Sequence, residues 1–167
     1  MELTDILSKE EWARFEKELF EEFHLDCTVY NASGFSITGQ KHWCNRLCPK
    51  IKENKDALSA ICATGNQVFA AQARQTGKPM IDECDAGLLK IAVPIFVKGE
   101  FLGTAGGCGL LLEDGEVEDF IVQKTTGMDE DEIAALCDGI GSMTEKEARE
   151  MAAAVEERIS QIVKDFS

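Results

Sequence analysis

The stretch from residue 77 to residue 112 constrains the fold more than any other part of the chain. Its sequence, GKPMIDECDAGLLKIAVPIFVKGEFLGTAGGCGLLL, places two turn signals, at residues 85–87 and 98–99, between apolar runs. Apolar strands joined by short glycine-containing turns are typical of an antiparallel meander that is not open to water. The third run is rich in glycine, which often marks the close approach of a ligand or another backbone. We therefore predict a sheet with room for a ligand over its third strand.

Helices are expected on either side of this meander. The sequence Ser8-Lys9-Glu10-Glu11 has the form of a capping box, and apolar residues at helical spacing follow it up to residue 24. A short strand at residues 26–30 and a hairpin partner at residues 35–38 come next. The other predicted helices are residues 41–51, 54–76, 115–124, 129–137 and 145–166. The expected fold class is α+β: a PAS-like antiparallel sheet of five or six strands, with helices packed on one face and a C-terminal signalling helix.

The last predicted helix carries a regular apolar seam. Its members are spaced 4-3-4-3-4, as at the a and d positions of a coiled coil. They are Ala148, Ala152, Val155, Ile159, Ile162 and Phe166. We expect residues 1–143 to form one domain and residues 144–167 a coiled-coil-like helix, whose first half packs inward. The second half is expected to project and to form a homodimer or lead into an output domain. The alternative is that a monomer buries the whole stripe against its own sheet.

Charge and hydropathy exclude several classes of function. The net charge of −14 disfavours direct binding to nucleic acid. Residues 41–78 are the exception, with seven basic and two acidic side chains. No apolar run is long enough to predict a membrane span. An acidic segment follows Met1 in place of a signal peptide, so we expect a cytoplasmic protein.

Seven cysteines are the most distinctive part of the composition. Cys44 and Cys48 are spaced to share one face of a helix, Cys62 lies on the apolar face of the next helix, and Cys84 and Cys108 belong to the meander. If the helices fold over the sheet, the five thiols converge, and four thiolates suit zinc or an iron–sulfur cluster. We predict Cys44, Cys48, Cys62 and Cys84 as metal ligands. Free thiols, inert or redox-active, are the open alternative, with a disulfide less favoured.

The meander and its flanks also resemble the PocR family of sensory domains, named for the regulator of propanediol utilisation. The matching pattern is Gly77-Lys78-Pro79, Cys84, Ala86-Gly87-Leu88, Ala92, Pro94-Ile95, Gly99, Leu102-Gly103 and Gly107, with Cys44, Cys62 and residues 3–7 upstream. The resemblance covers nearly the whole chain. It implies a PAS-like domain that binds a small molecule ahead of a DNA-binding, kinase or other signalling output.

Two positions depart from the family pattern. Asp85 stands where the family commonly has His, and Cys108 stands where it commonly has Gln. Both positions are expected to contact the ligand, so the departures favour a ligand chemistry different from that of a diol. The predicted ligand-binding residues are Trp43, Cys62, Cys84, Asp85, Gly107 and Cys108.

These observations predict a sensory domain of a bacterial signal-transduction or transcription regulator. It would bind a small molecule or a cysteine-ligated metal centre and transmit the change through its C-terminal helix. The alternative is a cysteine-based redox or electron-transfer protein. We expect no enzyme, because the two histidines, His24 and His42, complete no arrangement of nucleophile, base and orienting group.

Overall fold

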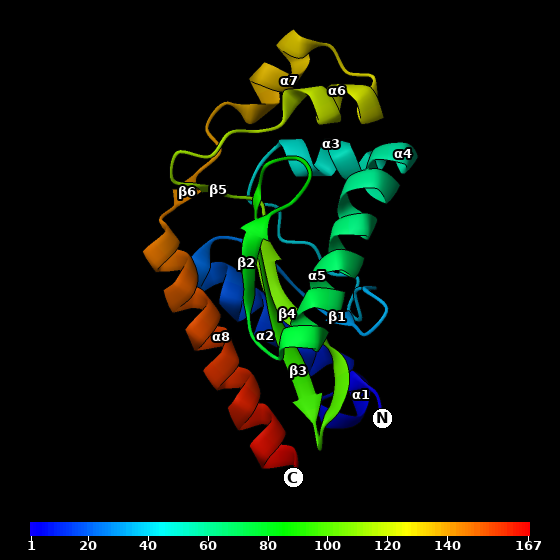
Figure 1. The fold of residues 1–167 in the computed structure, drawn as a ribbon, viewed down its shortest axis with the longest axis vertical. Helices are drawn as coiled ribbons and strands as arrows, with labels where there is room; N and C mark the ends of the chain where they lie inside the picture. Colours follow the sequence, from blue (N-terminus) through cyan, green and yellow to red (C-terminus); the bar gives the residue numbers. More distant parts are fainter.

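The computed structural model describes every residue from Met1 to Ser167, and its centre is a four-stranded antiparallel sheet (Figure 1). The strand order is β1-β4-β3-β2. The bounds are Asp26–Asn31 for β1, Met80–Glu83 for β2, Leu89–Val97 for β3 and Glu100–Cys108 for β4. The meander is therefore confirmed, with β2, β3 and β4 following one another along the chain. The largely helical segment between β1 and β2 carries the chain from one edge of the sheet to the other.

The sheet has fewer strands than the sequence predicts. The hairpin partner at residues 35–38 is reduced to a single bridge between Tyr30 and Ser36. The apolar run after β4 does not extend that strand either: the regular pairing ends at Cys108, and Gly109 and Leu110 keep only main-chain hydrogen bonds to Leu89. Instead β5 (Leu111–Leu112) pairs in parallel with β6 (Ser142–Met143) as a separate small sheet.

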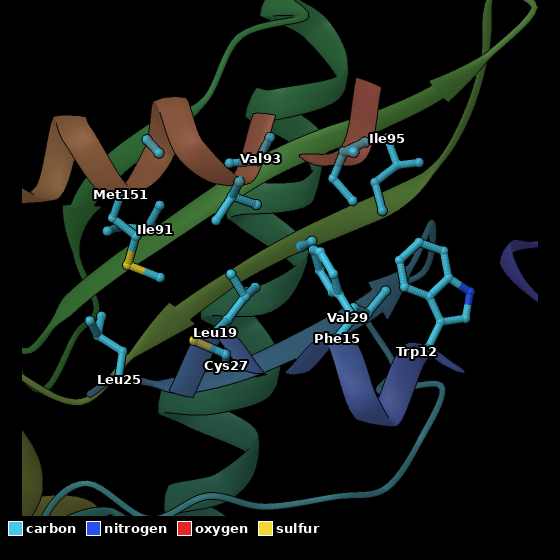
Figure 2. Packing of buried hydrophobic residues seen from close by; sticks show 14 of the residues in the cluster. Trp12, Phe15, Leu19, Leu25, Cys27, Val29, Ile91, Val93, Ile95 and Met151 are labelled. Atoms are coloured by element: carbon cyan, nitrogen blue, oxygen red, sulfur yellow. The ribbon is translucent and has the colours of Figure 1, made fainter. Parts of the chain in front are cut away.

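One face of the sheet is closed by helix α2 (Lys9–Phe23) and helix α8 (Glu145–Phe166). Short helix α1 (Leu3–Ile6) lies beside α8. Figure 2 shows side chains of both helices meeting alternate residues of β1 and β3. Twenty-one buried residues form this cluster, with Trp12, Val29, Ile91, Val93 and Met151 among them. Burial of a side chain such as Trp12 stabilises the fold by about 1.5–3 kcal/mol or more, so this face holds most of the hydrophobic core.

The other face lies under a second group of helices. They are α3 (Leu47–Glu53), α4 (Lys55–Ala57), the π-helix η1 (Leu58–Ala63) and α5 (Thr64–Thr76), with α6 (Asp119–Thr126) and α7 (Glu130–Cys137) packed behind α3 and α4. A smaller cluster of seven buried residues joins these helices. The α+β class is thus confirmed, with the refinement that helices cover both faces of the sheet. None of the helices is long and apolar enough to cross a bilayer.

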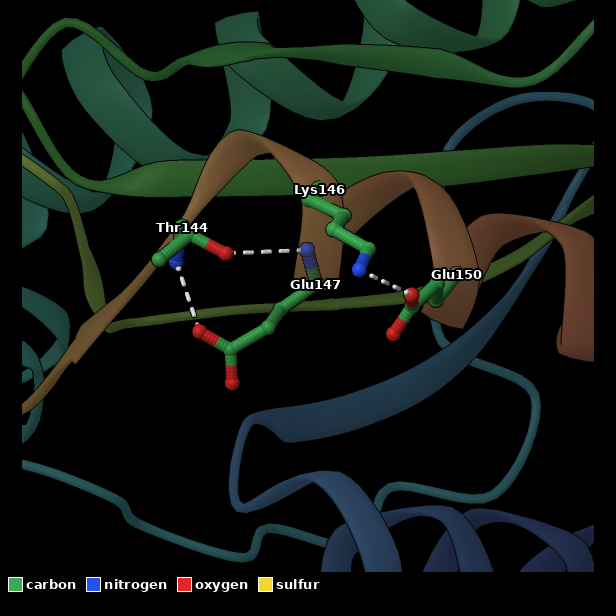
Figure 3. A network of polar contacts seen from close by, with 4 residues as sticks. All are labelled: Thr144, Lys146, Glu147 and Glu150. Atoms are coloured by element: carbon green, nitrogen blue, oxygen red, sulfur yellow. Dashed lines mark hydrogen bonds and ion pairs between the residues drawn. The ribbon is translucent and has the colours of Figure 1, made fainter.

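Helix α8 begins with the predicted capping box. The Thr144 hydroxyl accepts from the amide of Glu147, and the Glu147 carboxylate accepts from the amide of Thr144, each at 3.0 Å (Figure 3). A pair between Lys146 and Glu150 at 3.9 Å follows on the exposed side. The acidic carboxylates of this first turn face the positive end of the helix dipole, which favours helix formation there.

The expectation that the second half of α8 projects from the domain is wrong for Ile159. That side chain is 4 % exposed and belongs to the main core cluster, whereas Phe166 is 39 % exposed. The reason is length. A helix of 22 residues is about 33 Å long, and a strand of nine residues is about 30 Å long. The sheet therefore reaches almost to the end of the helix. The boundary at residue 144 and dimerisation both stay predictions.

Candidate ligand-binding site

A pocket lies between the open face of the sheet and the helices α3, η1 and α5. The pocket is small, with ≈ 30 Å³ open to the centre of a water-sized sphere, and part of it opens to solvent. Apolar side chains from several elements close it, among them Ile51, Ile61 and Leu88. Two lysines, Lys52 and Lys90, also reach it. The pocket is therefore neither a plain hydrophobic cavity nor a polar surface cleft.

Four thiols line this pocket: Cys48, Cys62, Cys84 and Cys108. They come from α3, η1, the turn after β2 and the end of β4, so four separate segments must meet to bring them together. No three His, Cys, Asp or Glu side chains lie close enough together to hold one metal ion. The cysteines form no disulfide. We call this set the thiol pocket.

The segment before α3 positions Cys48 and corrects one prediction. The Asn45 carboxamide accepts from the Cys48 amide at 2.7 Å and donates to the Gly109 carbonyl at 2.6 Å, which ties the start of α3 to the end of β4. Cys44 lies before the helix, so the predicted shared helical face with Cys48 is wrong. Proline is tolerated only in the first turn of a helix, and Pro49 accordingly sits there because the helix begins at Leu47.

Cys44 nevertheless lies next to the thiol pocket without lining it. Its thiol donates to the Cys108 carbonyl at 3.4 Å. This close approach depends on Gly109, whose φ is +109° and where any Cβ would come within 2.5 Å of the Cys44 sulfur. Burial raises the pKa of Cys44 to about 11.

The π-helix η1 places Cys62 toward the sheet. Such i→i+5 turns are rare and occur frequently at functional sites. The Thr64 hydroxyl donates to the Ser59 carbonyl at 2.9 Å, which satisfies a carbonyl in the widened turn. Residues 54–76, predicted as one helix capped by Asn54, are thus one continuous helical rod with a π segment inside it.

Two thiols of the pocket, Cys48 and Cys84, resist ionisation because their pKa values are raised. Burial raises the pKa of Cys48, and the charges of Cys108, Cys62 and Cys84 would raise it further. Burial likewise raises the pKa of Cys84. Burial lowers the pKa of Lys52, but the charges of Cys62, Tyr30 and Cys108 outweigh this, so its net shift is upward. A nearby cation favours ionisation of Cys48, and Lys52 is placed to act as one.

A smaller polar compartment adjoins the thiol pocket. Buried Asp26, Thr28, Lys90 and Thr104 line it, and Cys108 lies between the two spaces. Asp26 and Lys90 occupy positions directly opposite Cys108 on the two neighbouring strands, so all three side chains leave the same face of the sheet. The alternation of strand side chains explains why Cys27 and Ile91, one position away, face the closed core instead.

The predicted site residues separate into two groups. Cys48, Cys62, Cys84 and Cys108 meet at the thiol pocket. Gly107 borders the polar compartment. Trp43 and Asp85 are exposed and border neither space. Ligand or metal binding by any of these residues stays a prediction.

Sequence reasoning missed several polar residues of the site, namely Asp26, Tyr30, Asn45, Lys52, Asn66 and Lys90. Only Lys90 carries a clear signal, because it is the single charge within the otherwise apolar strand β3. The others lie in segments where polar residues are ordinarily expected on the protein surface. Their convergence depends on the way the helices fold back over the sheet.

The antiparallel sheet, the pocket on one of its faces and the covering helices make up a PAS-like domain. The model of a protein family described as the sensory domain found in PocR matches residues 5–166. Because this match spans nearly the whole chain, the protein belongs to the PocR sensory-domain family. Neither a search of curated proteins nor a search of solved structures returned a match.

Proposed function

We propose that this sensory domain holds a thiolate-ligated metal centre, an iron–sulfur cluster, in the thiol pocket and reports its state through helix α8. The observation that carries the proposal is the meeting of Cys48, Cys62, Cys84 and Cys108, from four separate segments, around one pocket. Three of these cysteines were predicted as ligands from the sequence, and Cys108 replaces Cys44 in the set. Such a centre would supply a redox- or oxygen-sensitive signal.

The arrangement of the thiols disfavours zinc. Zinc needs four ligands at about 2.0–2.3 Å from one point, and no three candidate ligands are arranged in that way. In a cluster each thiolate binds a different iron, so the ligands lie farther apart. The raised pKa values of Cys48 and Cys84 mean that binding must release protons. Lys52 is placed to offset the negative charge of the thiolates.

The route to helix α8 is short in this proposal. Cys108 faces the pocket, and the preceding residue, Gly107, faces the closed core. A Cβ on Gly107 would lie 3.3 Å from the Met151 methyl group of α8 and 2.8 Å from Leu25. A shift of the β4 main chain on binding would therefore press directly on α8. We propose that α8 passes this change to an output domain or to a second copy of the chain, as in a bacterial signal-transduction or transcription regulator.

The test is metal and sulfide analysis of anaerobically purified protein, with absorption and electron paramagnetic resonance spectra. We expect iron and acid-labile sulfide in the wild type, strongly reduced in Cys62→Ser and Cys108→Ser. Cys137→Ser is the matched control, because Cys137 lies on α7 outside the pocket. Wild-type protein that takes up no iron on reconstitution, or pocket variants that keep it, would refute the proposal.

The same experiment addresses the alternative of a cysteine-based redox protein. Metal-free protein whose pocket thiols form disulfides on mild oxidation, measured by mass spectrometry, would favour thiol chemistry. Zinc in place of iron would favour a structural centre.

A further inference from the structure

Four of the five buried polar or charged side chains of the chain line the polar compartment. They are Asp26, Thr28, Lys90 and Thr104, and only Glu16 lies elsewhere. Buried polar groups destabilise a fold unless they are hydrogen-bonded or paired. Their concentration at one place beside the thiol pocket indicates a constructed binding site.

Lys90 is a charged member of this group whose donors are only partly used. The residue is 7 % exposed and forms no ion pair. Its ammonium donates to the Asn66 carboxamide oxygen at 2.7 Å and lies 5.1 Å from the Tyr30 ring centroid and 5.6 Å from that of Phe69. An ammonium has three N–H donors, so two have no protein acceptor. The rings and the amide stabilise the cation without neutralising it.

Asp26 supplies an acceptor on the other side of Cys108. One carboxylate oxygen accepts from the His42 amide at 2.9 Å, and the second accepts no hydrogen bond from the protein. The two charged groups do not pair with each other, because they leave strands separated by β4. The compartment thus offers a cation on one side of Cys108 and an acceptor on the other, with the hydroxyls of Thr28 and Thr104 farther along the same face of the sheet.

We propose that the polar compartment binds a short hydroxycarboxylate, with its carboxylate on Lys90 and its hydroxyl donating to Asp26. The inference deepens the proposed function, since the ligand would lie against Cys108 at the edge of the thiol pocket. A neutral diol leaves the ammonium unpaired. The Asp26 carboxylate would repel a phosphate dianion, and the compartment supplies no second cation to offset that repulsion. The compartment is small, with ≈ 10 Å³ open to the centre of a water-sized sphere, and it shares Lys90 and Cys108 with the thiol pocket, so only the shortest members of this ligand class fit.

Calorimetric titration of the full chain with glycolate, ethylene glycol and inorganic phosphate tests this. Glycolate and ethylene glycol differ mainly in the carboxylate. A charged hydrogen-bonded partner is worth about 1.5–3 kcal/mol, so glycolate should bind roughly 10- to 150-fold more tightly than ethylene glycol. Lys90→Met should lose this preference. Lys50→Met, an exposed lysine on α3, should keep it. Equal binding of ethylene glycol, tighter binding of phosphate, or unchanged preference in Lys90→Met would overturn the inference.

If Lys90→Met does not fold, the comparison of the three ligands on the wild-type protein still tests whether the compartment prefers a hydroxycarboxylate. Iron content is measured on the same samples. Glycolate binding to protein that cannot take up iron would sustain this inference and refute the cluster, whereas iron-loaded protein without glycolate binding would refute this inference alone.

Discussion

The two faces of the sheet use the same strands for opposite purposes. On the face toward α2 and α8, β1, β3 and β4 present Cys27, Val29, Ile91, Val93 and Ala105, all buried in one apolar cluster. On the face toward α5, residues one position along the same strands include an acid, a lysine and a thiol. A sheet can separate these roles because successive side chains point to opposite faces. Stability is concentrated on the closed face, and the candidate site on the open one.

This comparison predicts the largest effect for a charge placed in the closed face. Ile159→Lys should lower the free energy of unfolding by more than about 4 kcal/mol, because it buries an unpaired ammonium. Phe166→Lys, on the exposed last turn of the same helix, should change it by no more than about 0.5 kcal/mol. Urea denaturation of both variants measures the difference. A folded, monomeric Ile159→Lys protein of wild-type stability would show that α8 is not part of the core.

Gly107 tests how tightly the closed face is packed. A Cβ there would lie 2.8 Å from the Leu25 Cβ and 3.1 Å from the Cys27 sulfur. Overpacking of this kind destabilises by about 1–3 kcal/mol, so Gly107→Ala should lower the free energy of unfolding by that amount. The measurement is again urea denaturation. A neutral result would mean that the closed face has spare volume.

Gly65, on α5, is the matching glycine of the open face. It borders the thiol pocket, and a Cβ there would meet no atom within 4 Å. Gly65→Ala should raise stability by about 0.5–1 kcal/mol, because alanine is favoured over glycine in a helix. The added methyl group should also narrow the pocket and reduce iron uptake. A variant that gains stability with unchanged uptake would place the occupant away from α5.

The smallest effect concerns Glu16, the one charged side chain buried behind the closed face. It accepts from the Val29 amide at 2.8 Å and the Thr38 hydroxyl at 2.6 Å. Burial raises its pKa above the ordinary value of 4.5, despite those two hydrogen bonds. The folded state therefore holds this proton more tightly than the unfolded state, and its contribution to stability falls as pH rises from about 4.5 through the raised pKa.

Glu16→Gln removes that titration. The stability of the wild type relative to Glu16→Gln should decline between pH 4.5 and pH 7.5, measured by urea denaturation at several pH values. A relative stability that rises over this range would mean that the hydrogen bonds to Val29 and Thr38 outweigh burial.

The sequence predicted the local features of the fold well. The caps at Ser8, Asn54 and Thr144 all form, because a capping interaction involves only three or four neighbouring residues. The meander also forms, since its turns and apolar runs are contiguous. The missing strand at residues 35–38 and the early start given to α3 both concern a loop whose path is set by distant partners, such as the Gly109 carbonyl that binds Asn45.

The candidate site could be predicted only in part for the same reason. Cysteine is a rare residue that often has a specific chemical role, so Cys48, Cys62, Cys84 and Cys108 can be predicted as candidate ligands from the sequence alone. Lys52, Asn66 and Tyr30 are ordinary residues in any helix or strand, and their role depends on tertiary contacts. Asp85 was predicted because it occupies a position where the resemblance implies a ligand contact, and Trp43 was predicted to lie near the cysteines, but neither side chain borders the pocket or the compartment.

The π-helix has a consequence for how this chain tolerates insertions and deletions. A π segment amounts to one extra residue accommodated within an α-helix, and each residue of an α-helix turns its successor by about 100°. Removal of one residue between Leu58 and Ala63 would let a regular α-helix form, which is intrinsically the more stable arrangement. On one side of the deletion, however, every side chain would rotate by about 100° around the helix axis. Either Cys62 or Asn66 would then leave the site. Homologues that lack this residue should therefore also lack one of these two side chains, whatever their overall similarity.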